Sequence, residues 1–286
     1  MRTRTSRRSG KRLPVRGSNR GASSPRLWHI GDSSDQNDRG RPIQYRLAAH
    51  NRRHAIPPAT VIPLSDPAVR SIALLESREG FVDLATFHDR IAVDLSRAHV
   101  ENTSPHFLKV RRGVAERLAA AAHTLPAGLR LYVKEGYRPL SLQRDYFTGH
   151  LAHLRRTLNP LPSDEALYEL ASHYVAPPEV AGHPTGAAID VTLLSADGTE
   201  LDMGCMLDAT DQESSGACYT HNSFISRPAA QNRQILIDAL TRAGFTNYPS
   251  EWWHWSFGDR YWAVMQNESH AIYGPVDENM LDEASR

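Results

Sequence analysis

The chain has 286 residues, of which 40% are hydrophobic and 23% are charged, and its formal net charge is +1. This length suffices for one fair-sized domain with extensions or for two small domains, and the composition is typical of a globular protein with a substantial core. A net charge near zero excludes a strong overall attraction to nucleic acid. No run approaches the ~20 apolar residues of a membrane-spanning helix.

Positive charge is concentrated at the N-terminus, where residues 1–44 hold ten Arg and Lys11 against three Asp. This stretch is nearly free of aliphatic residues, which predicts a disordered basic tail. The tail is either an arm that contacts nucleic acid or a membrane, or simply a solvated end of the chain. Because it has no apolar segment of a secretory signal, we expect a cytoplasmic protein. Residues 45–79 are expected to form a linker with a short helix near 67–77, and residues 271–286 a C-terminal tail.

Apolar periodicity predicts the elements of a folded domain over residues 80–270. Helices are expected at 109–123, 140–157, 163–174 with Ser163 as its cap, and 229–245 ended by Gly244. Strands are expected in FVDLATF (81–87), IAVDLSRA (91–98), 129–134, 186–194, a hairpin in SADGTELDMG (195–204), and SEWWHWSF (250–257) as the last strand. The mixture predicts an α+β fold in which helices pack around a mostly antiparallel sheet.

Two short segments carry residues suited to metal chemistry. His183 and Asp190 lie seven residues apart in GHPTGAAIDV, and Glu251 precedes His254 by three residues in EWWH. Two imidazoles and one carboxylate form a suitable ligand set for a catalytic Zn²⁺ ion, and a further carboxylate can act as general base. Residues three apart in a regular strand face opposite sides, so Glu251 and His254 share a site only if the segment twists, bulges or ends there. The alternative is a loop histidine, a strand-edge aspartate and a polar pair among aromatic residues.

Arg138 lies in KEGYRP, at the predicted end of a strand. A guanidinium group there could stabilise negative charge on a carbonyl oxygen or bind a carboxylate through two hydrogen bonds. The alternative is a surface arginine in a turn. The two cysteines, Cys205 and Cys218, have no CxxC spacing and are expected to be a reduced pair, with a disulfide across the loop as the alternative.

The motifs GYRP, HPTGAAIDVTL, LDMGCMLD, NRQIL, GF and EWWHW occur in the order seen in VanX-type D-alanyl-D-alanine dipeptidases. The resemblance covers roughly residues 80–265. These zinc peptidases form one family with the VanY-type D,D-carboxypeptidases, and their domain is similar to the hedgehog signalling domain. The resemblance implies one Zn²⁺ per chain, held by His183, Asp190 and His254. It also implies that Glu251 is the catalytic base, that Arg138 stabilises the tetrahedral intermediate, and that Asp208 lies near the free amino end of the substrate.

This sequence departs from the family pattern near the expected substrate. Ala181 stands where many members have Ser, and Glu135 replaces the usual Asp ahead of GYRP. An N-terminal motif is matched only at Asp94, Ala98 and Asn102. These departures bear on the identity of the dipeptide more than on hydrolysis itself.

The sequence therefore predicts a zinc dipeptidase that hydrolyses D-alanyl-D-alanine, or a similar D-amino-acid dipeptide, in cell-wall peptide turnover. Its partner is a small D-dipeptide, with no nucleic acid and no membrane span required. One alternative is a D,D- or L,D-carboxypeptidase acting on peptidoglycan stem peptides. The other is a non-catalytic binding domain that keeps the metal, although Glu251 and Arg138 favour an enzyme because a binding module needs no base beside its zinc.

Overall fold

The computed structural model describes residues 62–96, 102 and 104–283. The predicted basic tail and the first part of the predicted linker lie outside these residues. A five-stranded sheet forms the centre, in the order β3-β5-β6-β8-β7. Its strands are β3 (Ile91–Val93), β5 (Arg130–Glu135), β6 (Ala188–Leu194), β7 (Thr246–Asn247) and β8 (His254–Ser256). Within this five-stranded sheet only the β3–β5 pair is parallel, which confirms the predicted α+β class with a mostly antiparallel sheet.

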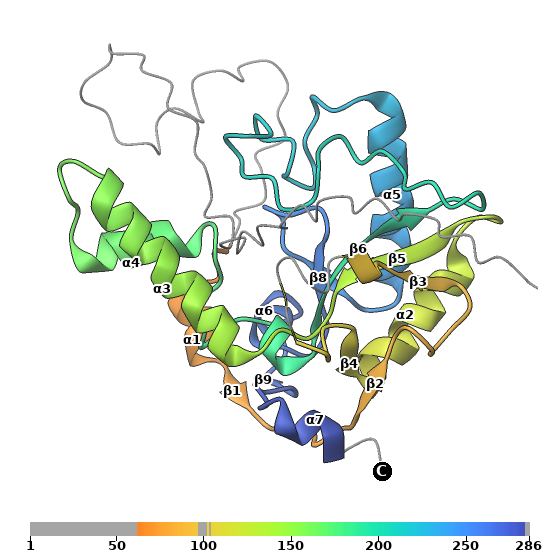
Figure 1. The fold of residues 1–286 in the computed structure, drawn as a ribbon, viewed down its shortest axis with the longest axis horizontal. Helices are drawn as coiled ribbons and strands as arrows, with labels where there is room; N and C mark the ends of the chain where they lie inside the picture. Colours follow the sequence, from red (N-terminus) through yellow and green to blue (C-terminus); the bar gives the residue numbers. More distant parts are fainter. Residues whose placement is uncertain (1–61, 97–101, 103, 284–286) are drawn as a thin grey trace, which may run out of the picture. The chain divides into compact units, whose positions relative to one another are not determined.

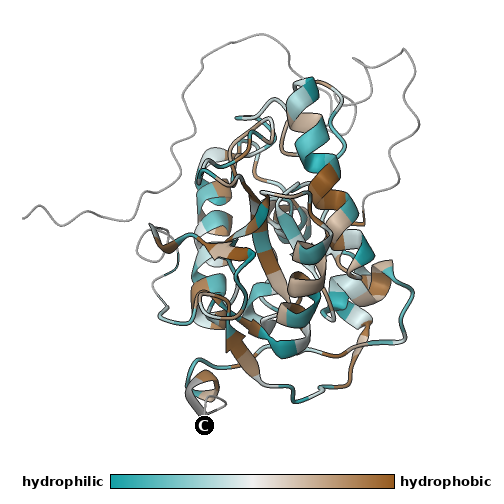
Figure 2. Ribbon diagram, turned by 90° about the vertical axis from the view of Figure 1, so that its right-hand side faces the viewer, coloured by the Kyte–Doolittle hydropathy of each residue, from teal (hydrophilic) through white to brown (hydrophobic). Residues whose placement is uncertain are grey.

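One face of this sheet is covered by two long helices, α2 (Arg112–Thr124) and α5 (Arg227–Arg242) (Figure 1). Both have an apolar stripe that packs in the same core as Ile189, Val191 and Leu193 of β6. Because side chains alternate along a strand, Asp190 points to the opposite face. In Figure 2 the central strands carry hydrophobic segments, whereas the helices around them alternate between hydrophobic and hydrophilic colours.

The other described elements surround this layer. A helical hairpin of α3 (Leu140–Thr157) and α4 (Asp164–Ser172) is held by edge-to-face packing of Phe147 on Tyr168. Two small two-stranded sheets and three short helices complete the fold: β1 (Ala73–Leu74) with β9 (His270–Ala271), β2 (Phe81–Asp83) with β4 (Lys109–Arg111), and α1 (Pro67–Ser71), α6 (Arg260–Met265) and α7 (Asn279–Glu283).

The four long predicted helices are confirmed, with changes at their ends. The helix predicted at 109–123 begins as strand β4, and the short helix near 67–77 is limited to α1. Ser163 caps α4 by accepting a hydrogen bond from the amide of Ala166, and α5 stops before Gly244, whose φ of +89° suits a glycine only. Local signals therefore set these helix ends.

Four strand predictions were wrong in extent. The strand predicted at 81–87 is limited to β2, Phe81–Asp83, and the strand predicted at 91–98 is limited to β3, Ile91–Val93. The segment 195–204 has the predicted turn, with φ +83° at Gly198, but its pairing is a single bridge between Leu194 and Glu200. SEWWHWSF is a turn followed by the three-residue strand β8, and it is not the last strand because β9 follows. The run of aromatic residues looked like a strand, but the amide of His254 donates to the carbonyl of Glu251 and closes a turn.

The proposed domain boundaries stay a prediction. Ordered structure already occurs within the predicted linker, where β1 pairs in parallel with β9. The predicted C-terminal tail contains α7, whose Leu281 is buried with Phe81, Tyr137 and Val276.

Candidate active site

Three ionisable side chains lie in one row across the sheet. In the register of the strands, Asp190 of β6 is paired with Glu135 of β5 on one side and with His254 of β8 on the other. A β-bulge between Val133 and Glu135 produces this row. Without the bulge, Glu135 would pair with Ile189. In a regular antiparallel pair, two residues forward on β5 correspond to two residues back on β6, so the pairing of Val133 with Val191 would be followed by that of Glu135 with Ile189. Paired residues present their side chains on the same face, so the row converges above the side of the sheet opposite α2 and α5.

His183 reaches this row from a single 3₁₀ turn, His183–Thr185, that precedes β6. The turn ends at Gly186, whose φ is +69°, and a Cβ atom there would lie 2.3 Å from the ring of Phe81. Only glycine fits this position. His183 is 5% exposed, and its Nδ1 lies 2.7 Å from the carbonyl oxygen of Gly136. A carbonyl can only accept, so Nδ1 carries a proton and Nε2 is the ring nitrogen that faces the row.

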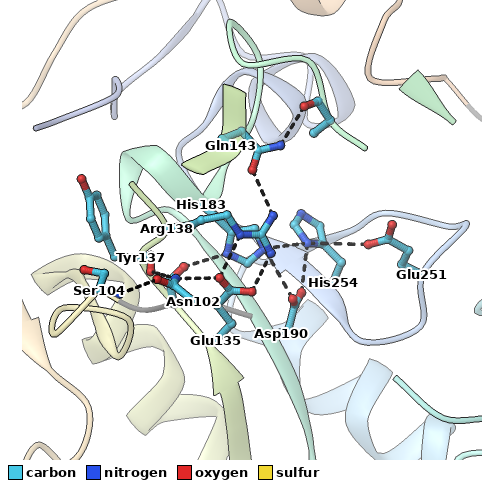
Figure 3. A network of polar contacts seen from close by, with 12 residues as sticks. Asn102, Ser104, Glu135, Tyr137, Arg138, Gln143, His183, Asp190, Glu251 and His254 are labelled. Carbon is cyan, nitrogen blue, oxygen red and sulfur yellow. Dashed lines mark hydrogen bonds and ion pairs between the residues drawn. The ribbon is translucent and has the colours of Figure 1, made fainter. Parts of the chain in front are cut away.

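His183, Asp190 and His254 each direct one possible ligand atom toward the others, and these atoms all lie within 4.8 Å of one another (Figure 3). Nε2 of His183 is 3.2 Å from Nδ1 of His254, which in turn is 3.1 Å from Oδ1 of Asp190. Oδ2 of Asp190 is 3.5 Å from Nε2 of His183. Neighbouring ligands of a tetrahedral zinc ion with bonds of 2.0–2.1 Å lie about 3.3 Å apart, so the donor set and its spacing both fit Zn²⁺.

Electrostatics couples these three groups. Burial alone would raise the pKa of Asp190, but the charges and hydrogen bonds of His183 and His254 outweigh it and hold that pKa well below its usual range. Burial opposes protonation of His254, yet its bond to Asp190 raises the pKa of His254 to about 9. His254 therefore holds its proton more strongly than an isolated imidazole does, and a bound metal ion would take the place of that proton.

Glu251 approaches from the turn before β8. Its amide donates to the carbonyl of Tyr248 and its carbonyl accepts from the amide of His254, so the chain folds back between the two residues. Oε2 of Glu251 lies 3.9 Å from Nδ1 of His254. The turn ends where β8 begins at His254, so Glu251 and His254 approach one another as their three-residue spacing requires. Burial raises the pKa of Glu251, which increases its basicity.

Arg138 borders the row on the side of Glu135 (Figure 3). Its Nε and Nη2 donate to the two carboxylate oxygens of Glu135 at 2.9 and 2.6 Å. Its Nη1 donates to Oε1 of Gln143 at 3.0 Å. Burial opposes the charge, but the carboxylate of Glu135 outweighs it and raises the pKa of Arg138. Arg138 is therefore a fixed cation beside the site, not a surface arginine in a turn.

Sequence patterns placed Glu135 and Asn102 near the expected substrate without a specific role and did not single out Gln143, although all three belong to the network around Arg138. Asn102 donates 2.8 Å hydrogen bonds to Glu135 and to the carbonyl of Tyr137. The position of Gln143 was a signal for a contact with Arg138. Gln143 lies five residues after Arg138, in the first turn of a predicted helix, and a helix that starts directly after a strand has its first turn close to the end of that strand.

The remaining predicted site residue, Asp208, lies in a turn. A hydrogen bond from the amide of Ala209 to the carbonyl of Met206 closes this turn. Its φ is +64°, a conformation that Asp tolerates better than most residues. Its assignment to the amino end of a substrate stays a prediction. The two cysteines are unpaired thiols in this structure.

A model of the M15 peptidase family, described as D-ala-D-ala dipeptidase, matches residues 79–272. The chain belongs to this family. The D-alanyl-D-alanine dipeptidase of Synechocystis sp. is 30% identical over 207 residues, which cover 63% of this chain and 83% of that protein. The enzyme of the same name from Enterococcus faecalis is 32% identical over 146 residues, 49% of this chain and 68% of that protein.

A solved structure of the LdcB LD-carboxypeptidase aligns over 73% of this chain and 79% of that chain, at 17% identity and a TM-score of 0.36. The family expected from the motifs is thus confirmed by the sequence comparisons, and with it the class of metallopeptidases that act as dipeptidases. Within the described residues, no helix is both long enough and apolar enough to cross a membrane.

Proposed function

We propose that this chain is a zinc-dependent dipeptidase that hydrolyses D-alanyl-D-alanine or a closely similar D-amino-acid dipeptide. The observation that carries the proposal is the convergence of His183, Asp190 and His254, with Glu251 on one side and Arg138 on the other. A binding domain would need only the first three residues. A partly buried carboxylate and a fixed guanidinium beside them are what peptide hydrolysis requires.

His183 Nε2, an oxygen of Asp190 and His254 Nδ1 would hold one zinc ion. When bound, Zn²⁺ supplies Lewis acidity, which polarises a peptide carbonyl and makes a nearby water more acidic. The hydrogen bond from His183 Nδ1 to Gly136 fixes the orientation and the tautomer of that imidazole. His254, whose pKa is raised by its bond to Asp190, has to lose a proton before it can serve as a ligand at neutral pH.

Glu251 has the role of general base. It takes a proton from the attacking water on a carboxylate oxygen and then gives that proton to the amine that leaves. Burial raises the pKa of Glu251 toward the range in which a carboxyl group both accepts and releases a proton readily. Its position at the turn before β8 brings Glu251 close to His254, although Glu251 is not one of the three convergent residues that would bind zinc.

Arg138 stabilises the negative charge that develops on the carbonyl oxygen of the substrate. Its bonds to Glu135 and Gln143 fix the guanidinium before substrate arrives, so little reorganisation accompanies the reaction. Asp208 is proposed to pair with the free ammonium group of the dipeptide, because a dipeptidase must recognise that group. Location in the cytoplasm and participation in cell-wall peptide turnover stay predictions from the sequence.

Metal analysis and kinetics on the purified chain test the proposal. We expect one zinc per chain and hydrolysis of D-alanyl-D-alanine with a kcat/KM about tenfold or more above that for a stem pentapeptide ending in the same two residues. L-alanyl-L-alanine is the stereochemical control. Preference for the pentapeptide would identify a carboxypeptidase. A zinc-loaded protein that cleaves none of these peptides would be a binding domain.

A further inference from the structure

Gln143 is an almost fully buried polar residue in the first turn of α3, with 1% of its surface exposed. Its amide carbonyl accepts the 3.0 Å hydrogen bond from Nη1 of Arg138, and its amide nitrogen donates at 2.8 Å to the carbonyl of Ala176 (Figure 3). Both ends of the side chain are therefore engaged. A buried glutamine costs free energy unless its amide is hydrogen-bonded, so this arrangement fixes the orientation of the amide.

The contacts of Arg138 divide its donors into two sets. A guanidinium group has five N–H donors, and within the described part of the chain Glu135 takes two of them and Gln143 takes one. One N–H on each terminal nitrogen remains for a substrate. These two donors are useful only if the plane of the guanidinium is fixed.

Glu135 alone does not fix that plane. A carboxylate that binds one edge of a guanidinium through two hydrogen bonds leaves a hinge, because the group can fold about the line joining the two oxygens. The bond from Nη1 to Gln143 lies off this line and removes the hinge. Gln143 also connects Arg138 to Ala176, in the segment that leads to His183, and the amide of Arg138 itself is 3.4 Å from the carbonyl of His183.

We propose that Gln143 is a positioning residue of the reaction, which holds the guanidinium of Arg138 at a fixed orientation toward the substrate. The proposal rests on the proposed function, in which Arg138 stabilises the developing charge. A neutral side chain suits this role, because a second carboxylate on Arg138 would offset the positive charge that the substrate needs. Ala176 holds Gln143 and Glu135 holds Arg138, so the orientation of both side chains is fixed before substrate binds.

The test is Gln143→Met, which keeps the length and removes both hydrogen bonds. We expect kcat to fall about 10- to 100-fold, because a small misplacement of a charge-stabilising group has effects of this size, with KM and zinc content unchanged. Gln234→Met is the matched control. Gln234 is an exposed helical glutamine that donates to Asp238 on α5, and its loss should leave kcat and KM unchanged.

A double-mutant cycle separates positioning from a general structural effect. In an Arg138→Ala background, Gln143→Met should cause no further loss, because Gln143 then has nothing to position. A second, independent fall in kcat, or a loss of zinc or of folded structure in Gln143→Met alone, would overturn the proposal. A crystal structure of Gln143→Met gives an answer that does not depend on activity. A displaced guanidinium is the expected result, and an unmoved one contradicts the proposal. A wild-type protein without turnover contradicts the proposed function instead.

Discussion

The residues around the candidate site are held in two different ways. Asp190 and His254 lie on neighbouring strands of one sheet, and their atoms meet at 3.1 Å although 64 residues separate them in sequence. His183 and Glu251 are held by short turns, one ended by Gly186 and one closed between Glu251 and His254. The register of the sheet thus fixes half of the site, and local backbone conformation fixes the other half.

This difference determines what a mutation does. A residue of the row is supported by ladder hydrogen bonds and by the core beneath the sheet, so its loss removes one functional group and leaves its neighbours in place. A turn depends on a few dihedral angles, so a change in the turn can move a functional group without removing it. The comparison can be tested with variants of both kinds.

The largest effect is expected for removal of a ligand from the turn. His183→Ala should abolish zinc binding and turnover together, because Asp190 and His254 alone provide too few ligands for a catalytic zinc site. Metal analysis by mass spectrometry after dialysis is the measurement, and His173→Ala, at an exposed histidine that ends α4, is the control. Full zinc occupancy in His183→Ala would reject the proposed ligand set.

Glu251→Ala should separate metal binding from catalysis. We expect zinc to be retained, because Glu251 is not one of the three convergent residues, and turnover to fall by about 10²- to 10⁴-fold or more, as general-base removal usually does. The measurement is kcat at saturating D-alanyl-D-alanine beside the zinc content of the same sample. Unchanged turnover would remove Glu251 from the mechanism.

Residues of both kinds, turn-held and sheet-held, were selected from the sequence, but one residue of the row was not. Residue types and the family motifs selected His183, Asp190, Glu251 and His254, and the apolar periodicity of the long helices was sufficient to predict them. The position of Glu135 beside Asp190 was not predictable. It depends on a bulge and on pairing between distant strands, and neither has a local signal.

Gln143 was missed for a related reason. Helical periodicity identifies buried positions by apolar side chains, and a glutamine at such a position is interpreted as exposed. The extent of β8 was overestimated because aromatic residues favour strands in general, whereas Trp252 and Trp253 lie in a turn here. In both cases tertiary contacts outweighed the intrinsic preference.

Gly186→Ala tests whether the turn positions His183 by backbone conformation alone. The new Cβ would lie 2.3 Å from the ring of Phe81 at a φ of +69°, so we expect a loss of stability of about 2–5 kcal/mol and weaker zinc binding with every ligand still present. Gly198→Ala is the matched control. Its φ is +83° and nothing lies within 4 Å of the new Cβ, so it should lose only about 1–2 kcal/mol and keep its zinc. Equal zinc affinity in the two variants would show that the turn does not position the ligand.

The smallest effect is expected at an ion pair on the sheet but outside the row. Nζ of Lys134, the residue at the bulge, donates to Asp94 at 2.8 Å and to Glu200 at 2.6 Å. Burial would raise the pKa of Asp94, but its hydrogen bonds from Lys134 and Ser96 outweigh burial and lower it. A carboxyl group whose pKa is lower in the folded state stabilises the fold above its unfolded pKa of about 3.9, and this contribution is lost as pH falls through the lower folded value.

Asp94→Asn should therefore destabilise the protein by about 1–3 kcal/mol at pH 7, the usual range for a hydrogen bond to a charged group. Because Lys134 keeps its hydrogen bond to Glu200 in this variant, the loss of stability should lie near the lower end of this range. The difference in unfolding free energy between variant and wild type should shrink as pH is lowered below about 4, which urea titrations at several pH values would measure. If turnover at neutral pH stays unchanged while stability falls, the bulge is supported by the sheet itself. If turnover falls as well, the ion pair at Lys134 helps to maintain the bulge that aligns Glu135 with Asp190. The row would then depend on this local contact as well as on the pairing of the strands.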